Sequence, residues 1–338
     1  AIRFVGSEPS DPLTARYNAL MIECLGKQGL EVYEVPRLKS SDGRFVTASR
    51  VRTLLDEGQY ARAAALTPGT THPYLLAALA GRALFLELDA PLKPGLVGPD
   101  SNGAHRDMDY ALMLRSVAAI RPFFPHMALA GSPEALRELG LEAETAMLAA
   151  TGGVNAHRGA IFALGLALNA ACCEMESADY KRVMYNRLVK IARVICDKSL
   201  LDNPLHSTEE SHGVQAVKAY GVKGARAMAM DGYQDMFAVW QPYYSSVRKE
   251  PLALQRTLLL LIASLDDTCI IHRVGYERAG SLKEEAAALF NEIAHDRDDA
   301  HTTDVLTALC RRYAAEGVSP GGAADMLALT IFIDSIIS

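Results

Sequence analysis

Residues 93–109 read KPGLVGPDSNGAHRDMD, and the rest of the chain is best understood as a support for this stretch. It combines glycine, proline and asparagine with one lysine, one histidine, one arginine and three aspartates, in a loop that leads into a helix. A loop that only connects two elements has no need for so many reactive groups. We therefore expect the stretch to form part of an active site carried by a helical domain.

The composition indicates a helical protein. Of 338 residues, 50% are hydrophobic, 22% are charged and only 7% are aromatic, a profile rich in helix-forming alanine and leucine. The longest apolar run, 258–263, is too short to cross a bilayer, so no membrane segment is expected. The six cysteines form no zinc or disulfide pattern, which favours the reducing cytoplasm. The net charge of −6 argues against nucleic-acid binding and requires local cations for any polyanionic ligand.

Residues 1–66 differ from the rest and predict a small, partial α/β segment. Strand patterns at 3–5 and 30–35 alternate with helix patterns at 13–25 and 51–55. Thr47 and Ser49 precede the second helix, and Arg52 lies one turn inside it. These residues fit either a phosphate at a helix N-terminus or a plain N-cap.

Residues 67–338 predict an all-helical domain, so the fold class is mainly α. Helices are expected at 74–88, 108–120, 133–150, 160–175, 181–196, 223–230, 251–265, 283–294, 303–315 and 321–337. The almost wholly apolar helix at 160–175 should be central. The connections 198–213 and 241–249 are candidate active-site loops.

The opening stretch supplies candidate catalytic acids. If its helix begins near Asn102, His105 and Asp109 lie one turn apart on one face, and Asp107 points elsewhere. One aspartate could then bind metal while the other positions or acts as a base. The alternative is that both acids only favour the helix dipole, but that does not explain Lys93.

A second motif, TGGVNAHRG at 151–159, favours a phosphate site over a simple turn. Asn155 can cap the helix, and His157 and Arg158 fall in its first turn. Cationic side chains are unfavourable there unless an anion is bound as well.

Two further motifs lie near the C-terminus. In DDTCIIHR at 266–273, Asp266 and Asp267 follow an apolar run and should lie deep, where they need a metal ion or Arg273 as partner. A structural ion pair is the alternative. In SPGGAAD at 319–325, Ser319 and the following proline are typical of a helix start, and alone this motif favours that plain interpretation.

Two family resemblances join these observations. RFVGSEP, EVYEVPR and VTASRVRTLL resemble the C-terminal part of the citrate lyase ligase family, without its first phosphate motif. From about residue 70, KPGLV, NGAHRDMD, TGGVNAHRGAIFALG, HG with YG and GAR, DDTCIIHR and SPGGAADMLA occur in the order of the triphosphoribosyl-dephospho-CoA synthase family. That resemblance implies transfer of the 5-triphosphoribosyl group of ATP to the 2′-hydroxyl of 3′-dephospho-CoA, with release of adenine. The product is a precursor of the citrate lyase prosthetic group, and its α linkage implies inversion at the ribose.

The resemblance also implies residue roles. Asp107, Asp109 and His105 are expected at the reaction centre, and Asp266, Asp267 and Asp107 as ligands of Mg²⁺. The residues expected to bind substrate or phosphate are Lys93, Asn102, Arg106, Asn155, His157, Arg158, Arg226, His272, Arg273 and Ser319. The ligase-like segment suggests a multifunctional fusion linked to the citrate lyase acyl carrier protein. The alternatives are a helical Mg²⁺-dependent hydrolase of ADP-ribose-type N-glycosides, or a non-catalytic scaffold that binds nucleotide or carrier protein.

The chain departs from the synthase pattern at four positions. Cys269 stands where the family usually has asparagine, and Val274 where it has glycine. Ala227 and Met228 replace the usual glycine and glutamate after GAR. With the other acids retained, we expect the missing glutamate to have a supporting role.

Overall fold

The computed structural model describes residues 2–9, 11–172, 179–197, 212–296 and 298–337. Helices dominate these residues, and the strands β1 and β2 lie near the N-terminus. The predicted class, mainly α with a small N-terminal α/β segment, is confirmed.

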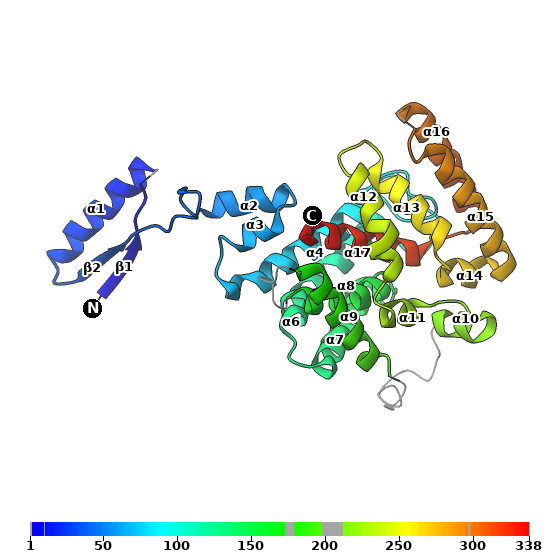
Figure 1. The fold of residues 1–338 in the computed structure, drawn as a ribbon, viewed down its shortest axis with the longest axis horizontal. Coiled ribbons are helices and arrows are strands. Elements are labelled where there is room, and N and C mark those ends of the chain that lie inside the picture. Colours follow the sequence, from blue (N-terminus) through cyan, green and yellow to red (C-terminus); the bar gives the residue numbers. More distant parts are fainter. Residues whose placement is uncertain (1, 10, 173–178, 198–211, 297, 338) are drawn as a thin grey trace.

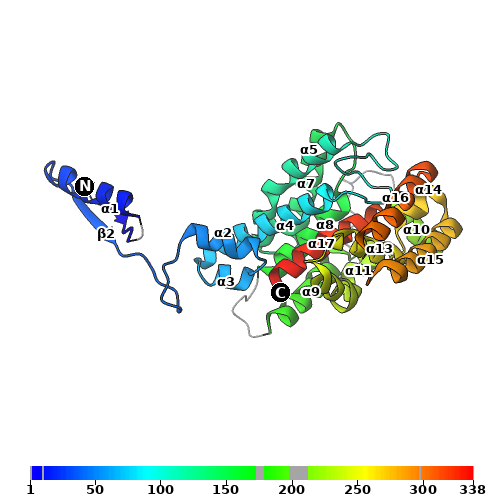
Figure 2. The same cartoon turned by 90° about the horizontal axis from the view of Figure 1, so that it is seen from above.

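The N-terminal unit consists of β1 (Ile2–Gly6), α1 (Pro12–Gly26) and β2 (Glu31–Val35). The two strands are parallel, with Ile2 opposite Glu31, as expected for a strand–helix–strand unit. Asn18 of α1 donates its side-chain N–H to Gly6 O at 2.7 Å and so fixes the helix on the strands. Figures 1 and 2 show this unit standing away from the helical body, joined to it by an extended segment.

Helices α2 (Ala48–Asp56) and α3 (Tyr60–Ala64) follow this segment. The hydroxyl of Thr47 accepts the Arg50 N–H at 3.1 Å, so Thr47 is the N-cap of α2. This agrees with the interpretation of these residues as a plain N-cap. Leu54 and Tyr60 are buried, and α3 packs on the C-terminal helix α17 (Gly321–Ile337). These two helices thus pack with the helical body, and the domain boundary at residue 66 stays a prediction.

The body is built around three helices that are largely buried, α4 (His72–Asp89), α8 (Arg158–Ala171) and α17. Helix α17 packs against both of the others (Figure 1). The central position predicted for 160–175 is confirmed as far as the described residues reach. The remaining helices are α5 (Tyr110–Ile120), α6 (Phe124–Leu129), α7 (Pro133–Thr151), α9 (Tyr180–Ile195), α10 (His212–Tyr220), α11 (Ala225–Met230), α12 (Gln241–Val247), α13 (Ala253–Ser264), α14 (Thr268–Val274), α15 (Tyr276–Ile293) and α16 (Asp299–Glu316).

Of the two candidate active-site loops, 241–249 is mostly helical, and its prediction as a loop was wrong. A π-helical turn at Met236–Trp240 runs directly into α12. Gln241 donates to the buried Asp334 carboxylate at 2.8 Å, so tertiary contacts support a segment with weak helix propensity. The other candidate loop, 198–213, lies almost entirely outside the described residues.

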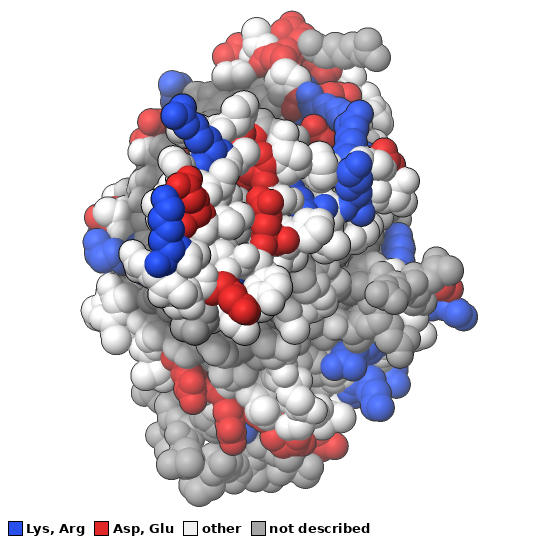
Figure 3. Space-filling view, turned by 90° about the vertical axis from the view of Figure 1, so that its left-hand side faces the viewer, with Lys and Arg blue, Asp and Glu red and all other residues white. Residues whose placement is uncertain are grey.

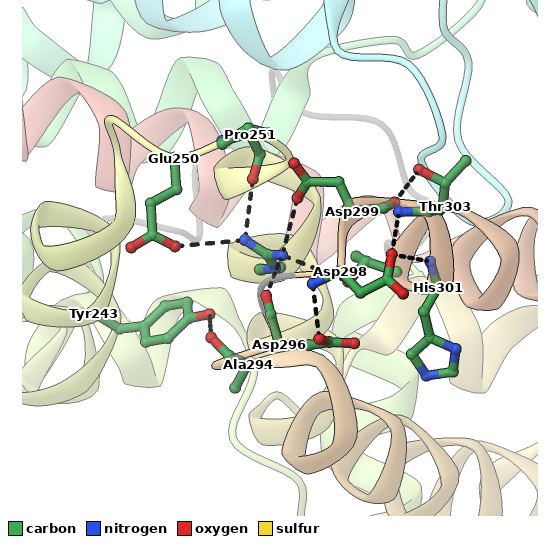
Figure 4. A network of polar contacts seen from close by, with 12 residues as sticks. Tyr243, Glu250, Pro251, Ala294, Asp296, Asp298, Asp299, His301 and Thr303 are labelled. Atoms are coloured by element: carbon green, nitrogen blue, oxygen red, sulfur yellow. Dashed lines mark hydrogen bonds and ion pairs between the residues drawn. The ribbon is translucent and has the colours of Figure 1, made fainter.

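A buried arginine, Arg256, fixes α13 to the connection between α15 and α16. Figure 4 shows the network and labels its partners Glu250, Pro251, Asp296 and Asp299. The Arg256 side chain is 2% exposed and donates to Pro251 O at 3.1 Å and Asp296 O at 2.8 Å. Glu250 and Asp299 lie 3.5 and 3.4 Å from its guanidinium and compensate its charge. This part of the scaffold therefore depends on one charged side chain.

Both Asp/Glu and Lys/Arg side chains occur on the face seen in Figure 3. In the described parts of the chain, we find no helix with the length and apolar character needed to traverse a membrane.

Candidate functional site

The loop at 93–109 folds back on the segment that precedes α17. Gly95 has a φ of 71°, and a Cβ at this position would overlap the carbonyl oxygen of Val318. Only glycine combines this left-handed backbone with so close an approach. The Ala104 N–H donates to Gly95 O at 3.0 Å and closes the loop. The conformation is therefore specific and brings the loop against the start of α17.

The helix after this loop begins later than predicted. Helix α5 starts at Tyr110, and Asp109 is its N-cap, because its Oδ1 accepts the Leu112 N–H at 2.7 Å. The predicted start near Asn102 is wrong, and so is the placement of His105 and Asp109 on one helix face. Asp109 has a structural task that accounts for its position without any catalytic role.

Lys93 lies in a buried ion pair that the sequence did not reveal. Its Nζ is 2.6 Å from Glu87 Oε1, and the two side chains are 2% and 6% exposed. The same Nζ donates to the Glu87 backbone oxygen at 2.6 Å. The pair ties the loop to the end of α4. A signal was available, since Glu87 is an acid in an otherwise largely apolar helix six residues before Lys93.

His105 connects three elements. Arg273 of α14 donates to its Nδ1 at 3.1 Å, so Nδ1 is the acceptor and the Nε2–H donates to Ser319 Oγ at 2.8 Å. Burial, followed by the positive charge of Arg273, lowers the pKa of His105. Asp107 Oδ1 lies 3.6 Å from Nδ1, and its side chain is 59% exposed. The site thus has a neutral histidine held in one orientation beside an accessible carboxylate.

The two adjacent aspartates have different environments. Asp266 is exposed, and its Oδ1 pairs with Lys283 Nζ at 2.7 Å, so the expectation that it lies deep was wrong. Asp267 is buried and caps two helices. Its Oδ1 accepts the Cys269 N–H of α14 at 2.8 Å, and its Oδ2 accepts the Ala323 N–H of α17 at 2.9 Å. Backbone donors compensate this acid, so we assign Asp267 a capping role, and its role as a Mg²⁺ ligand stays a prediction.

His157 is buried directly before α8. Its Nδ1 is 2.7 Å from Ser116 Oγ, and among the described residues its Nε2 has no hydrogen-bond partner. Burial, then the positive charge of Lys93, lowers the pKa of His157 to about 4. The side chain is therefore neutral at pH 7, and the argument that a cation in this turn requires an anion does not apply to it.

The neighbouring motif residues are at the surface. Asn155 Oδ1 accepts the Arg158 N–H at 3.2 Å, and the Arg158 guanidinium forms an ion pair with Glu144. The N-cap of α8 is His157, and Asn155 accepts the first N–H of the helix from just before it. The ion pair compensates the Arg158 cation. The predicted phosphate site stays a prediction. The other predicted binding residues that are exposed are Asn102 and Arg106 in the loop, Arg226 on α11 and His272 on α14.

Asp325 of α17 is a functional candidate that we did not select from the sequence. A Cβ at Gly159 would overlap its carboxylate, so it lies against the first turn of α8, where it accepts the Ala160 N–H. Burial, followed by the negative charges of Glu87 and Asp267, raises its pKa well above the usual range. The residue is nevertheless partly exposed. The carboxyl group is thus placed as a cap at the first turn of α8.

The substitutions relative to the synthase pattern fit this arrangement. Met228 and Val274 are partly buried and pack against the hydrophobic core. Cys269 is exposed and donates its backbone N–H to Asp267, a bond that does not depend on its side chain. Nothing in the structure explains Ala227.

Two cavities lie near the body's surface. One of about 350 Å³ is lined by Lys93, Gly95 and Gly103 of the loop and by Cys310 and Arg311 of α16. The other, of about 490 Å³, lies between α2, α4, α12 and α17 and is lined by none of the predicted site residues. We therefore place the candidate site at the loop. Within the described ranges, no three His, Cys, Asp or Glu side chains are grouped so that they could hold a metal ion.

Comparisons with known proteins show the family of the chain. Residues 73–338 match the family model of ATP:dephospho-CoA triphosphoribosyl transferase, and residues 1–75 match the citrate lyase ligase C-terminal domain. A probable 2-(5''-triphosphoribosyl)-3'-dephosphocoenzyme-A synthase of Pseudomonas syringae pv. syringae (strain B728a) is 38% identical over 274 residues, which are 77% of this chain and 91% of that protein. A protein of the same name from Azotobacter vinelandii is 37% identical over 271 residues, 76% of this chain and 90% of the relative. No solved structure matches the chain. The chain therefore belongs to the ATP:dephospho-CoA triphosphoribosyl transferase family.

Proposed function

We propose that this chain transfers the 5-triphosphoribosyl group of ATP to the 2′-hydroxyl of 3′-dephospho-CoA and releases adenine. The observation that carries the proposal is the family match over 73–338, the same residues that bring His105, Arg273 and Ser319 together at the loop. Relatives that share more than a third of their residues with this chain bear the synthase name.

The reaction needs a base for the acceptor 2′-hydroxyl and surroundings that stabilise a positively charged transition state. Cleavage of the ribose C1′–N9 bond develops oxocarbenium character, and the 2′-hydroxyl must lose its proton as it attacks. Asp107 suits the base because its carboxylate is accessible and lies beside the neutral His105. His105 lies beside this group and is itself held by Arg273 and Ser319. Inversion requires the acid to stand on the opposite face of the ribose.

The substrates together carry five phosphate groups, so the site must compensate a large negative charge. We propose that Arg273 and Arg106 contact phosphate oxygens, since both are exposed at the loop. Mg²⁺ suits this site as well, because it is usually held by one or two carboxylates together with substrate phosphates. Asp107 is the accessible carboxylate here, and the ion would supply charge neutralisation when bound.

The test compares two aspartates of the same loop. Asp107→Asn should slow adenine release by about 10²-fold or more, the usual contribution of a general base. Asp109→Asn keeps a capping side chain and should retain most activity. Adenine is followed by chromatography, and the dephospho-CoA adduct by mass spectrometry. Activity of Asp107→Asn close to that of the unchanged protein would refute the role of Asp107.

The same assay separates the two alternatives. A hydrolase would yield free ribose triphosphate in place of the adduct, and a scaffold would yield neither product. Neither alternative is favoured by the family membership.

The N-terminal segment suggests a wider context. Because residues 1–75 match a citrate lyase ligase domain, we propose a functional link to the citrate lyase acyl carrier protein, in the cytoplasm. Binding of this carrier, measured by calorimetry with the full chain and with a variant starting at residue 47, would test the link. Equal affinity of both would count against it.

A further inference from the structure

We propose that the cavity between the loop and α16 holds a polyphosphate chain of the substrates, and that Arg311 binds this chain. The inference rests on the proposed function. It adds a binding residue that we did not select from the sequence, on a helix that carries none of the predicted site residues.

The spacing of residues on α16 explains one wall of the cavity. Thr307, Cys310 and Arg311 line it, and steps of three and four residues place them on one face of the helix. Leu306 and Tyr313 are buried and belong to the hydrophobic core. The cavity volume of about 350 Å³ is near the lower end of the range of about 300–1,000 Å³ for ligand sites. It therefore suits part of a substrate, such as a phosphate chain, and not a whole dephospho-CoA molecule.

Arg311 is the cation at this cavity that is available to a ligand. Lys93 lines the cavity too, but its Nζ lies 2.6 Å from the Glu87 carboxylate and is committed to it. The next arginine of α16, Arg312, pairs with Glu285 at 2.7 Å. Arg311 is exposed, and among the described residues its guanidinium has no hydrogen-bond or ion-pair partner. A guanidinium in this position can bind phosphate oxygens through two parallel N–H groups.

The other polar groups that line the cavity are compatible with an anion. Burial raises the pKa of the Cys310 thiol to about 11, so the thiol is uncharged at neutral pH. Ser101 and Thr307 contribute hydroxyl groups, which can donate to phosphate oxygens. Asp100 is the acid among the lining residues, and its side chain is exposed, so solvent and salt screen its charge. A carboxylate beside a phosphate chain also suits Mg²⁺ that arrives with the chain.

The cavity adjoins the residues that meet at His105. Gly103 lines it and lies two residues before His105, so their Cα atoms are at most about 7.6 Å apart. Gly95 lines it as well and packs against Val318, which directly precedes Ser319. Ser319 in turn contacts His105 at 2.8 Å. Both reacting riboses carry their phosphates on C5′, so a chain in this cavity can extend to a ribose beside His105.

Binding measurements with each ligand alone test the proposal. Arg311→Gln removes the charge and keeps a polar side chain. Isothermal titration calorimetry gives the Kd for ATP, for 3′-dephospho-CoA and for AMP, which has the adenosine of ATP but a single phosphate. Loss of a charge-assisted contact should raise the Kd for ATP, for dephospho-CoA or for both by about 10- to 100-fold. The ligand that loses affinity identifies the chain that occupies the cavity.

AMP serves as the internal reference. Its Kd should change by less than about threefold, because AMP lacks the chain. Unchanged Kd values for both substrates would overturn the proposal. So would a loss of affinity for AMP as large as the loss for the substrates.

A second variant fills the cavity without changing its charge. Thr307→Phe adds a ring to the α16 wall and should raise the same Kd by about tenfold or more. A melting curve shows whether the variant is folded. In a folded Thr307→Phe protein, an unchanged Kd would contradict occupation of the cavity. If the variant does not fold, the comparison of Arg311→Gln with the unchanged protein decides.

Lys249→Gln provides a matched control. Lys249 is exposed, lines the second cavity and, within the described ranges, has no ion-pair partner. This variant loses the same charge as Arg311→Gln and should bind both substrates like the unchanged protein. Losses as large as those in Arg311→Gln would assign the effect to net charge and overturn the role of Arg311. Adduct formation by the unchanged protein is measured separately, and its absence would refute the proposed function, whereas the Kd values test Arg311.

Discussion

Replacement of Lys93 by methionine tests the buried ion pair that anchors the loop. The Nζ and the Glu87 carboxylate lie 2.6 Å apart, with side-chain exposures of 2% and 6%. Methionine fills a similar volume but leaves the Glu87 charge buried without a partner. Loss of one member of such a pair costs about 3–5 kcal/mol. At about 2–4 °C per kcal/mol for a domain somewhat smaller than this body, the melting temperature should fall by about 6–20 °C.

The double variant Lys93→Met/Glu87→Met tests whether the instability of the single variant comes from the unpaired charge. Replacing both charges by apolar side chains of similar size is often neutral or stabilising, so the double variant should lie within about 2 kcal/mol of the unchanged protein. Urea denaturation at pH 7, followed by circular dichroism, gives the free energies of unfolding for the four proteins of the cycle. A loss below about 1 kcal/mol in Lys93→Met would show that the two side chains are not buried together. A double variant whose loss of unfolding free energy equals the sum of the losses in the two single variants would lead to the same conclusion.

The same double variant decides between two roles for Lys93. We expected it to bind phosphate, and its contacts give it a structural role. If the folded double variant keeps the KM for ATP, Lys93 acts through the position of the loop. A KM raised tenfold or more in a stable protein would indicate direct phosphate contact.

Three further outcomes are expected. Arg256→Met should lower the free energy of unfolding by about 3 kcal/mol, because the carbonyl and carboxylate groups around it lose their buried donor; a denaturant midpoint unchanged from the parent protein would count against that network. His157 has a pKa of about 4 in the folded protein, below its unfolded value of about 6.5. Its contribution to the free energy of unfolding is therefore complete above about pH 6.5, and up to about 3 kcal/mol of it is lost as the pH falls through 4. In His157→Gln the melting temperature should therefore fall less between pH 7 and pH 4 than in the unchanged protein. An equal fall in both proteins would contradict the prediction. Gly159→Ala should lower the free energy of unfolding by about 1–3 kcal/mol because its Cβ meets the Asp325 carboxylate, whereas Gly140→Ala, with open space around its Cβ, should be neutral or stabilising in the same denaturation assay.

The regular elements were accessible from the sequence because their signals are local. Proline and glycine mark the limits of α7, predicted at 133–150 and found at Pro133–Thr151. The N-terminal alternation of strand and helix was found for the same reason. The short helix α12 was missed, because its seven residues carry little periodicity and a contact with Asp334, distant in sequence, supports it.

The candidate site could be predicted from the sequence only in part, because contacts between segments that are distant in sequence determine its arrangement. The motifs pointed to Ser319, His105 and Arg273 separately, and the structure brings them together through the histidine, which the sequence did not show. Asp266 and Asp267 look equivalent in sequence, and a single residue step places one in solvent and the other under two helices. Which acid is compensated by which donor follows from the fold and not from spacing.

This difference in compensation explains how a site for polyanions tolerates so many acids. Glu87 is neutralised by Lys93, and Asp267 by backbone N–H groups of two helices. Asp325 has one such donor, the Ala160 N–H, and burial together with the charges of Glu87 and Asp267 raises its pKa well above the usual range. A triphosphate bound near these acids would raise the cost of ionising Asp325 further, because its charge has the same sign.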